Sequence, residues 1–113
     1  MKIESYSFGK IIVDGIRYSS DIIIFPDRVD SSWWRKQSHY VNLEDIPQIL
    51  DENADIIIFG TGSYDLMKID EQVKDEFTRR NIELIIENTG QAVQTYNNLS
   101  KDKNIIAALH LTC

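Results

Sequence analysis

Two short segments place small polar residues directly after apolar runs that are typical of strands. Gly60-Thr61-Gly62 follows DIIIF, and Asn88-Thr89-Gly90 follows IELIIE. Ligands of open α/β sheets bind beyond the carboxyl ends of parallel strands. Asn88 or Thr89 would also cap a helix, whose free N–H groups attract a carboxylate or phosphate. The two segments therefore predict neighbouring loops that present Thr61 and Thr89 to one crevice, where a small anion could bind.

Neither segment completes a known phosphate-binding motif. A dinucleotide fingerprint needs a third glycine where this chain has Asp65, and a P-loop needs Gly-Lys-Ser/Thr. Two glycines also suit a sharp turn between a strand and a helix, and Asn88 also suits a cap with no ligand. Both interpretations stay open. In either case we expect Gly62 to adopt a positive φ angle or to approach another backbone closely.

A second candidate surface is aromatic. Trp33-Trp34-Arg35-Lys36 combines stacking rings with positive charge, but four residues do not make a nucleic-acid groove. The commoner arrangement puts one tryptophan in the core and the other in a partner surface. Trp33, Trp34 and the nearby His39 are therefore the candidate surface for a protein partner.

Catalytic and metal chemistry find little support in the sequence. Ser63, His39 and Asp65 have the residue types of a catalytic triad, but the chain lacks the GxSxG turn that exposes a catalytic serine. Neither His39 nor His110 has a second histidine or cysteine at metal spacing, and Cys113 is the only cysteine. His110, within an apolar strand, is expected to be structural. We assign no catalytic residue and no metal ligand.

Glu83 and Glu87 are the remaining candidates for acid–base chemistry. Their spacing puts both carboxylates on one face of a strand. Exposed strand ends explain the same pattern, so we assign them no catalytic role.

Composition limits the class of protein. A chain of 113 residues, 42% hydrophobic and 27% charged, suits a single domain over residues 1–113. No apolar run approaches a membrane span, and the start MKIESYSF lacks a secretory signal, so a soluble cytoplasmic protein is expected. The net charge of −6 disfavours nucleic acid.

The elements that would position these residues follow from the patterning. Asp14-Gly15 predicts a tight turn within antiparallel strands over residues 3–18. The two DIIIF runs are continuous rather than alternating, which predicts strands covered on both faces, and Pro26 ends the first of them. A short helix is expected around Pro47. The second DIIIF run and the four segments after it predict a β-α-β-α-β order. These four segments are apolar residues at helical spacing (Ile69, Val73, Phe77), the strand IELIIE, apolar residues again at helical spacing (Ala92, Val93, Tyr96, Leu99), and the strand IIAALHL.

Asn97 lies beside the apolar face of the last predicted helix. A partly buried amide needs hydrogen-bond partners. We expect its side chain to bond the backbone of a neighbouring loop.

The order of these elements resembles a family of small domains from archaea, bacteria and mitochondria. The resemblance spans nearly the whole chain, from WW with His39 through FGTG to AALHL. The family includes the third of a series of mitochondrial respiratory complex I assembly factors and the adipogenesis-associated domain protein, and the chain resembles an archaeal member. The most specific elements are FGTG and T-x-x-A-x-x-T-Y-N-x-L, here Thr89, Ala92, Thr95, Tyr96, Asn97 and Leu99.

The resemblance implies a three-layer α/β fold. It has a central mixed sheet of about five strands, helices on its faces and a small N-terminal β layer, with the last strand antiparallel to the others. The family carries no established catalytic residue and no cofactor, and its mitochondrial member contacts other proteins during assembly. Many relatives have an acidic-Gly-Arg stretch where this chain has Asp102-Lys103-Asn104, so an anion bound by that arginine is in doubt here.

Two functions remain open. The first is a non-catalytic binding or assembly-adaptor domain that acts through contacts with an unknown protein partner, with self-association also open. The alternative is a small-molecule binding protein or enzyme, with an anion crevice at Gly60-Thr61-Gly62 and Asn88-Thr89-Gly90.

Overall fold

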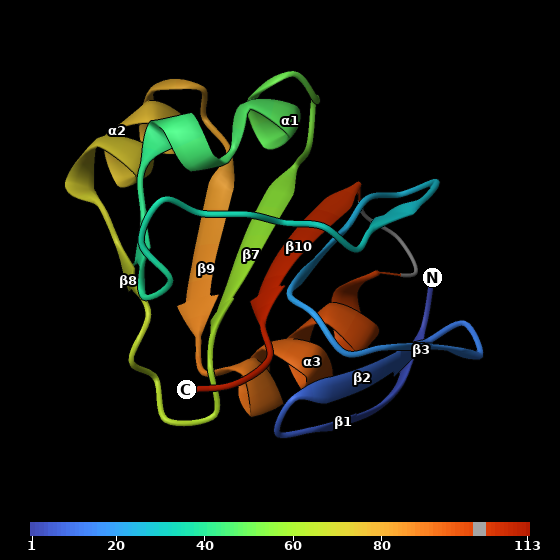
Figure 1. Cartoon of the computed structure of the whole chain (residues 1–113). Helices are drawn as coiled ribbons and strands as arrows, with labels where there is room; N and C mark the ends of the chain where they lie inside the picture. Colours follow the sequence, from blue (N-terminus) through green and yellow to red (C-terminus); the bar gives the residue numbers. More distant parts are fainter. Residues whose placement is uncertain (101–103) are drawn as a thin grey trace.

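The structure is a computed structural model, which describes residues 1–100 and 104–113 (Figure 1). The Asp102-Lys103 part of the unusual segment lies outside the described residues. The described elements are, in chain order, β1 (Ile3–Ser7), β2 (Lys10–Val13), β3 (Ile16–Tyr18), β4 (Ile22–Ile24), β5 (Val29–Asp30), β6 (Tyr40–Val41), the 3-10 helix η1 (Leu43–Asp45), α1 (Pro47–Leu50), β7 (Ile56–Thr61), β8 (Lys68–Ile69), α2 (Glu71–Arg79), β9 (Glu83–Glu87), α3 (Thr89–Leu99) and β10 (Ile105–His110).

The central sheet has five strands in the order β5-β4-β10-β7-β9. Strand β10 pairs in parallel with β7, which pairs in parallel with β9, whereas β4 is antiparallel to β10. The expectation that the last strand runs antiparallel to the others is therefore wrong. The physical reason is the crossover through α3, which returns the chain to the end of the sheet where β9 began, so that β10 repeats the direction of β9.

Both DIIIF runs form interior strands, β4 and β7, as predicted. Alternate side chains of β7 enter two separate cores. Ile57 and Phe59 pack with α1, α2 and the segment 31–41, which crosses the sheet in Figure 1. Ile56 and Ile58 pack on the other face, toward α3 and the N-terminal strands. The mixed α/β fold with a five-stranded sheet and helices on its faces is confirmed.

The N-terminal layer is the three-stranded antiparallel sheet β1-β2-β3. Asp14 and Gly15 have φ angles of 48° and 79°, so the predicted turn between β2 and β3 is confirmed. Ile3, Ile11 and Val13 are buried and join the core on the α3 side. This layer therefore depends on α3 for the burial of its apolar face.

Asn97 fastens α3 to the outer edge of β1. Its amide oxygen accepts a hydrogen bond from the Ile3 N–H at 3.0 Å, and its amide nitrogen donates to the Ile3 carbonyl at 2.8 Å. These are the two bonds that a neighbouring strand would make. The expected bonding to backbone is confirmed, although the partner belongs to a strand rather than a loop.

Replacing Asn97 should therefore destabilise the protein. Asn97→Leu leaves the buried N–H and C=O of Ile3 without partners, which should lower the free energy of unfolding by about 1–3 kcal/mol in denaturant titrations. The matched control is Asn98→Leu on the exposed side of the same helix, which should change the value by less than about 0.5 kcal/mol. Equal effects of the two substitutions would contradict the role of Asn97.

Candidate functional site

The two loops predicted to share a crevice are joined by hydrogen bonds. The Gly62 N–H donates to the Thr89 hydroxyl oxygen at 2.8 Å, and the Thr89 N–H donates to the Gly62 carbonyl at 3.1 Å. The Thr89 hydroxyl in turn donates to the His110 carbonyl at 2.6 Å. Three segments, at the ends of β7, β9 and β10, are thus held together at one point.

The Thr61 hydroxyl is occupied in the same way. It donates to the Glu87 carbonyl at 3.0 Å and also contacts the carboxylate of Asp65. Thr61 and Thr89 are both buried. The loops are neighbours, as predicted, but the two hydroxyls bind the protein itself rather than facing a shared open space.

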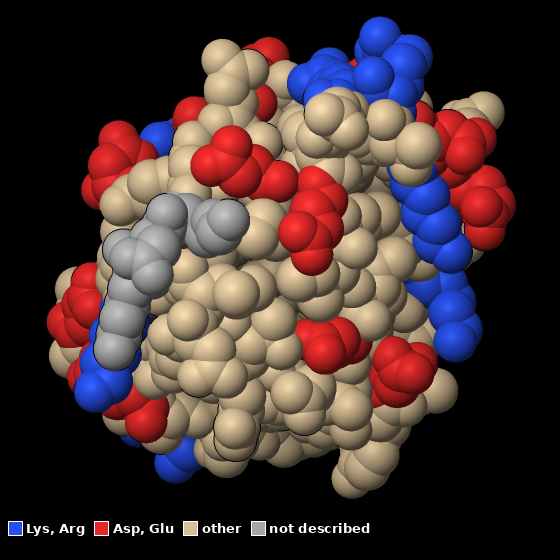
Figure 2. Space-filling view, turned by 180° about the vertical axis from the view of Figure 1, so that it is seen from behind, with Lys and Arg blue, Asp and Glu red and all other residues tan. Residues whose placement is uncertain are grey.

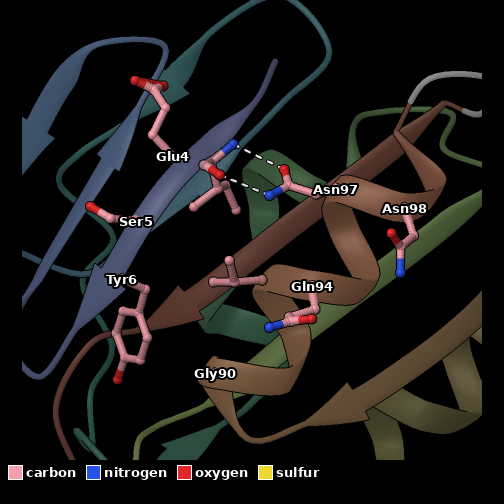
Figure 3. A pocket seen from close by; sticks show the side chains of 9 residues that line it. Glu4, Ser5, Tyr6, Gly90, Gln94, Asn97 and Asn98 are labelled. Carbon is pink, nitrogen blue, oxygen red and sulfur yellow. Dashed lines mark hydrogen bonds between the residues drawn. The ribbon is translucent and has the colours of Figure 1, made fainter.

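The hydrogen-bonded loops separate two grooves. One, of about 430 Å³, lies between β9 and the start of α2 and is lined by Thr61 and Asn88 together with both Lys68 and Lys74. The other, of about 420 Å³, lies between β1 and α3, where Gly90 lines it (Figure 3). Gly60, Gly62 and Thr89 line neither groove. The structure therefore divides the six predicted crevice residues between two grooves and the contact that separates them.

The absence of a side chain matters at Gly60 and Gly62. A Cβ at Gly60 would lie 2.8 Å from the Leu109 side chain and 3.0 Å from the Thr89 hydroxyl. Gly62 has a φ of 100°, and a Cβ there would overlap the main-chain carbonyl of Cys113. The prediction for Gly62 is confirmed on both counts, positive φ and close backbone approach.

A buried cluster of charged groups lies next to Gly62. The Asp21 carboxylate is 2.7 Å from the Arg35 Nη2 and 2.7 Å from the His110 Nδ1, and it accepts the Leu111 N–H at 2.8 Å. The Arg35 guanidinium also donates to the Ser38 carbonyl at 2.7 Å. The cluster joins the start of β4, the segment that crosses the sheet and the end of β10.

These contacts determine the titration of Asp21. Burial alone would raise its pKa, but the hydrogen bonds from His110, the Leu111 N–H and Arg35 outweigh burial and hold the pKa below its ordinary value. Asp21 is therefore a carboxylate at neutral pH. It neutralises the guanidinium of Arg35, whose side chain is only 3% exposed and lies over the Trp33 ring at 4.3 Å.

The order Asp21, His110, Thr112 resembles a catalytic triad, but its geometry does not favour catalysis. The His110 Nε2 lies 3.5 Å from the Thr112 hydroxyl, which is the outer limit of a hydrogen bond. His110 is buried, and its ring packs against His39 with centroids 5.4 Å apart. We interpret the cluster as structural, which agrees with the prediction for His110.

Sequence reasoning did not find Asp21, and it noted Arg35 only as a positive charge beside the tryptophans. The one available signal was a charged residue at the start of an apolar strand. The partners of Asp21 are 14 to 90 residues away in the chain, so no local spacing indicates the pairing. Ser63, His39 and Asp65 do not form a triad: within the described residues, Ser63 bonds Tyr6, and Asp65 bonds Thr61.

The loop after Gly62 is held against the segment that follows β10. The Ser63 N–H donates to the Thr112 carbonyl at 2.6 Å, and the Leu66 N–H donates to the Cys113 carbonyl at 3.1 Å. Tyr6 contacts the Ser63 hydroxyl and donates to the Leu111 carbonyl. Burial raises the pKa of Tyr6, which keeps this phenol protonated as a donor.

This loop presents apolar side chains to solvent. Tyr64 is 69% exposed and Leu66 is 50% exposed. Phe8, in the turn between β1 and β2, is 54% exposed, and its ring centroid lies 6.0 Å from that of Tyr64. We call Phe8, Tyr64 and Leu66 the aromatic patch.

The two tryptophans have different environments. Trp33 is 5% exposed, its indole N–H donates to the Asp45 carbonyl, and it belongs to the core, so its assignment to a partner surface is wrong. The reason is its size: burial of the ring fills the core under the crossing segment. Trp34 is 75% exposed, and His39 is also exposed, so both remain candidates for a partner surface.

Comparison with known proteins finds a family and several solved structures. A family model described as "Protein of unknown function (DUF498/DUF598)" matches residues 3–110. A conserved hypothetical protein from Pyrococcus horikoshii is 28% identical, with both chains fully covered and a TM-score of 0.86. A protein of Bartonella henselae, named an outer membrane protein, is 24% identical, with 98% of this chain and 94% of that chain covered and a TM-score of 0.82. A Mth938-like domain of Bordetella pertussis is 18% identical, with 97% and 85% covered and a TM-score of 0.64. The last two likenesses show the fold alone.

Two features are absent from the described residues. No helix among residues 1–100 and 104–113 is long and apolar enough to cross a membrane. In the same ranges, no group of three or more His, Cys, Asp or Glu residues is placed to hold a metal ion.

Substitution of Gly62 tests the contact between the loops. Gly62→Ala should lower the free energy of unfolding by about 2–5 kcal/mol, because the backbone there has a positive φ and the added methyl group would overlap the Cys113 carbonyl. Gly90→Ala is the matched control, since a Cβ there meets only the Asn88 side chain at 3.5 Å. Gly90→Ala in a helix should leave stability unchanged or raise it by up to about 1 kcal/mol. A neutral Gly62→Ala in thermal or urea unfolding would contradict the steric argument.

The lowered pKa of Asp21 predicts a pH dependence. Its contribution to stability is present above the ordinary value of 3.8 and is lost as pH falls through the folded-state pKa, which is lower. Asp21→Asn should be less stable than the wild type by about 3–5 kcal/mol at neutral pH, because the buried Arg35 loses its partner. Urea titrations between about pH 5 and pH 2 should show this difference narrowing toward the acid end. A constant difference over that range would show that the Asp21 carboxylate does not stabilise the fold.

Proposed function

The chain belongs to the family of proteins of unknown function described as DUF498/DUF598, and on that premise we propose that it is a non-catalytic domain that binds a partner protein through the aromatic patch. The observation that supports this proposal is the exposure of Phe8, Tyr64 and Leu66 on backbone that is fixed by hydrogen bonds. A rigid apolar surface loses little conformational entropy when it binds, so it suits a partner better than a mobile loop would.

The charge of the chain favours a partner with basic groups. The net charge is −6. Seen from behind the view of Figure 1, acidic side chains lie across the middle of the surface and also along its edges, whereas Lys and Arg side chains lie toward its rim (Figure 2). A partner that offers apolar side chains together with Lys or Arg would match this domain in both respects.

The resemblance to a complex I assembly factor supports the same role. We infer an assembly-adaptor domain of an archaeal, cytoplasmic protein. Trp34 and His39 would extend the contact beyond the aromatic patch. His110 is buried, and the hydroxyls of Thr61 and Thr89 already donate hydrogen bonds to backbone carbonyls. These residues therefore present no reactive group to solvent, which favours binding over catalysis.

A second candidate function is the binding of a small anion in the groove between β9 and α2. Lys68 and Lys74 favour this function, because they line the groove together with Thr61 and Asn88. The carboxylates of Asp65, Glu71 and Glu87 line the same groove and oppose it. We therefore place anion binding second.

Photocrosslinking tests the proposed protein partner. A photoreactive phenylalanine analogue would replace Phe8 or Tyr64, and the purified full chain would be irradiated in lysate of the source organism. We expect the same crosslinked protein from both positions. Ile16 is the matched control, because it is an exposed apolar residue of β3 outside the aromatic patch. Leu66→Ser should lower the crosslinking yield severalfold, while changing the free energy of unfolding by less than about 0.5 kcal/mol.

The result distinguishes the two functions. The same product from Ile16, or no product from Phe8 and Tyr64, would overturn the aromatic patch as the binding surface. The anion alternative is tested separately by adding inorganic phosphate to isotopically labelled protein. Saturable NMR shifts at the amides of Thr61, Lys68 and Asn88, which line that groove, would favour it.

A further inference from the structure

Among residues 1–100 and 104–113, no strand lies on the outer edge of β9. Within these ranges β9 pairs with β7 alone and ends the central sheet on that side. Its middle residues are all apolar, and Ile86 is 38% exposed. The opposite edge strand, β5, has only two residues and includes Asp30. Proteins usually shorten or charge their sheet edges, or place proline there, to prevent pairing. Strand β9 has five residues and no proline, and its charged residues, Glu83 and Glu87, lie only at its two ends.

Hydrogen bonds show which backbone groups of β9 face outward. The Glu83 N–H donates to the Asp55 carbonyl at 3.2 Å, and the Glu87 carbonyl accepts the Thr61 hydroxyl. The backbone groups of these two residues therefore face β7. Because successive residues of a parallel strand direct these groups to opposite sides, Leu84 and Ile86 direct their N–H and C=O groups outward. The structure assigns these outward groups no hydrogen bond among the described residues.

The side chains beside this edge follow a charge pattern. Glu83, Ile85 and Glu87 lie on the face that packs toward α3, with the two carboxylates at either side of Ile85. Helix α3 has no Lys or Arg, and within the described residues neither glutamate forms an ion pair. Glu87 instead accepts the Thr95 hydroxyl at 2.7 Å. Two glutamates whose Cα atoms are about 13 Å apart, at the usual rise of a strand, thus flank an apolar position.

A second copy of the chain does not fit this pattern. An antiparallel pairing centred on Ile85 would place Glu83 of each copy opposite Glu87 of the other. Like charges directly opposite each other destabilise a strand pair. Shifting one copy along the other would separate these like charges, but it would leave fewer of the five residues of β9 paired. The charges therefore oppose self-pairing and favour an extended segment with basic residues.

We propose that β9 is a docking edge, at which an extended segment of another protein adds to the central sheet as a sixth strand. The segment carries Lys or Arg at two positions four residues apart and an apolar residue midway between them. This pattern reads the same in both directions, so it suits parallel or antiparallel addition. The Leu84 and Ile86 backbone supplies the hydrogen bonds, and Glu83 and Glu87 supply the selectivity for basic residues. The groove beside Ile86 leaves room for a side chain on the opposite face.

This edge is independent of the aromatic patch, so either proposal can fail without the other. The probe is the blocked heptapeptide Gly-Lys-Thr-Val-Thr-Lys-Gly, titrated into labelled full-length protein to about 5 mM, a range suited to weak edge contacts. We expect the Leu84 and Ile86 amide signals to shift saturably and their hydrogen exchange to slow. A peptide with both lysines replaced by glutamate should bind at least about tenfold more weakly.

Ile86→Pro tests the backbone contribution. Proline removes an N–H that faces outward, so it breaks no bond to β7 and is tolerated at a sheet edge. It should abolish peptide binding, while Ile86→Thr, which keeps the N–H, should bind within about threefold of the wild type. Circular dichroism checks that both variants fold. If the proline variant does not fold, Glu83→Lys replaces it, and this variant should bind the lysine peptide several times more weakly.

Three outcomes would overturn the proposal. The first is no shift at the Leu84 and Ile86 amides with the lysine peptide. The second is equal affinity for the lysine and glutamate peptides. The third is a shift confined to Phe8, Tyr64 and Leu66, which would place peptide binding at the aromatic patch and not at β9.

Discussion

The reciprocal hydrogen bonds between Gly62 and Thr89 are the contact on which the arrangement of the molecule depends. They join the end of β7 to the start of α3, and the Thr89 hydroxyl extends the connection to His110 at the end of β10. A side chain at Gly62 would disrupt the contact, since the Cys113 carbonyl occupies that space. The glycine is thus required by packing, and it also fixes the loop that carries Tyr64 and Leu66.

The buried cluster around Asp21 extends these connections from β10 to its other neighbour in the sheet, β4. A charged Arg35 is tolerated there because Asp21 accepts its hydrogen bond and the Trp33 ring covers it. The same carboxylate accepts the Leu111 N–H. One acidic residue therefore holds both the crossing segment and the end of β10. Together with Gly62 it makes the carboxyl ends of the strands a rigid platform and not an open pocket.

The sequence predicted local features well and long-range contacts poorly. The Asp14-Gly15 turn, the two interior strands and the Asn88 cap depend on near neighbours, and each was found from local pattern. Asn97 was recognised as needing backbone partners, but its bond to Ile3 spans 94 residues. The same reason explains Thr61 and Thr89: their position at strand ends was predictable, whereas the partners that occupy their hydroxyls come from other strands. Trp33 and Trp34 are adjacent in sequence, so only the fold could decide which ring is buried.

The position of β10 has a consequence for how the protein folds while it is being synthesised. This strand is the last in the sequence, yet it lies in the middle of the sheet, between β4 and β7. On the ribosome the two DIIIF strands emerge before β10 does, each apolar on both faces and each lacking the neighbour that separates them in the finished fold. At a translation rate of about 5–20 residues per second, the nascent chain spends seconds with these strand edges unpaired. The identical DIIIF strands could pair with each other, or with those of another nascent chain, during that time. Unpaired apolar edges are prone to aggregation, so this interval is where a chaperone would protect the nascent chain.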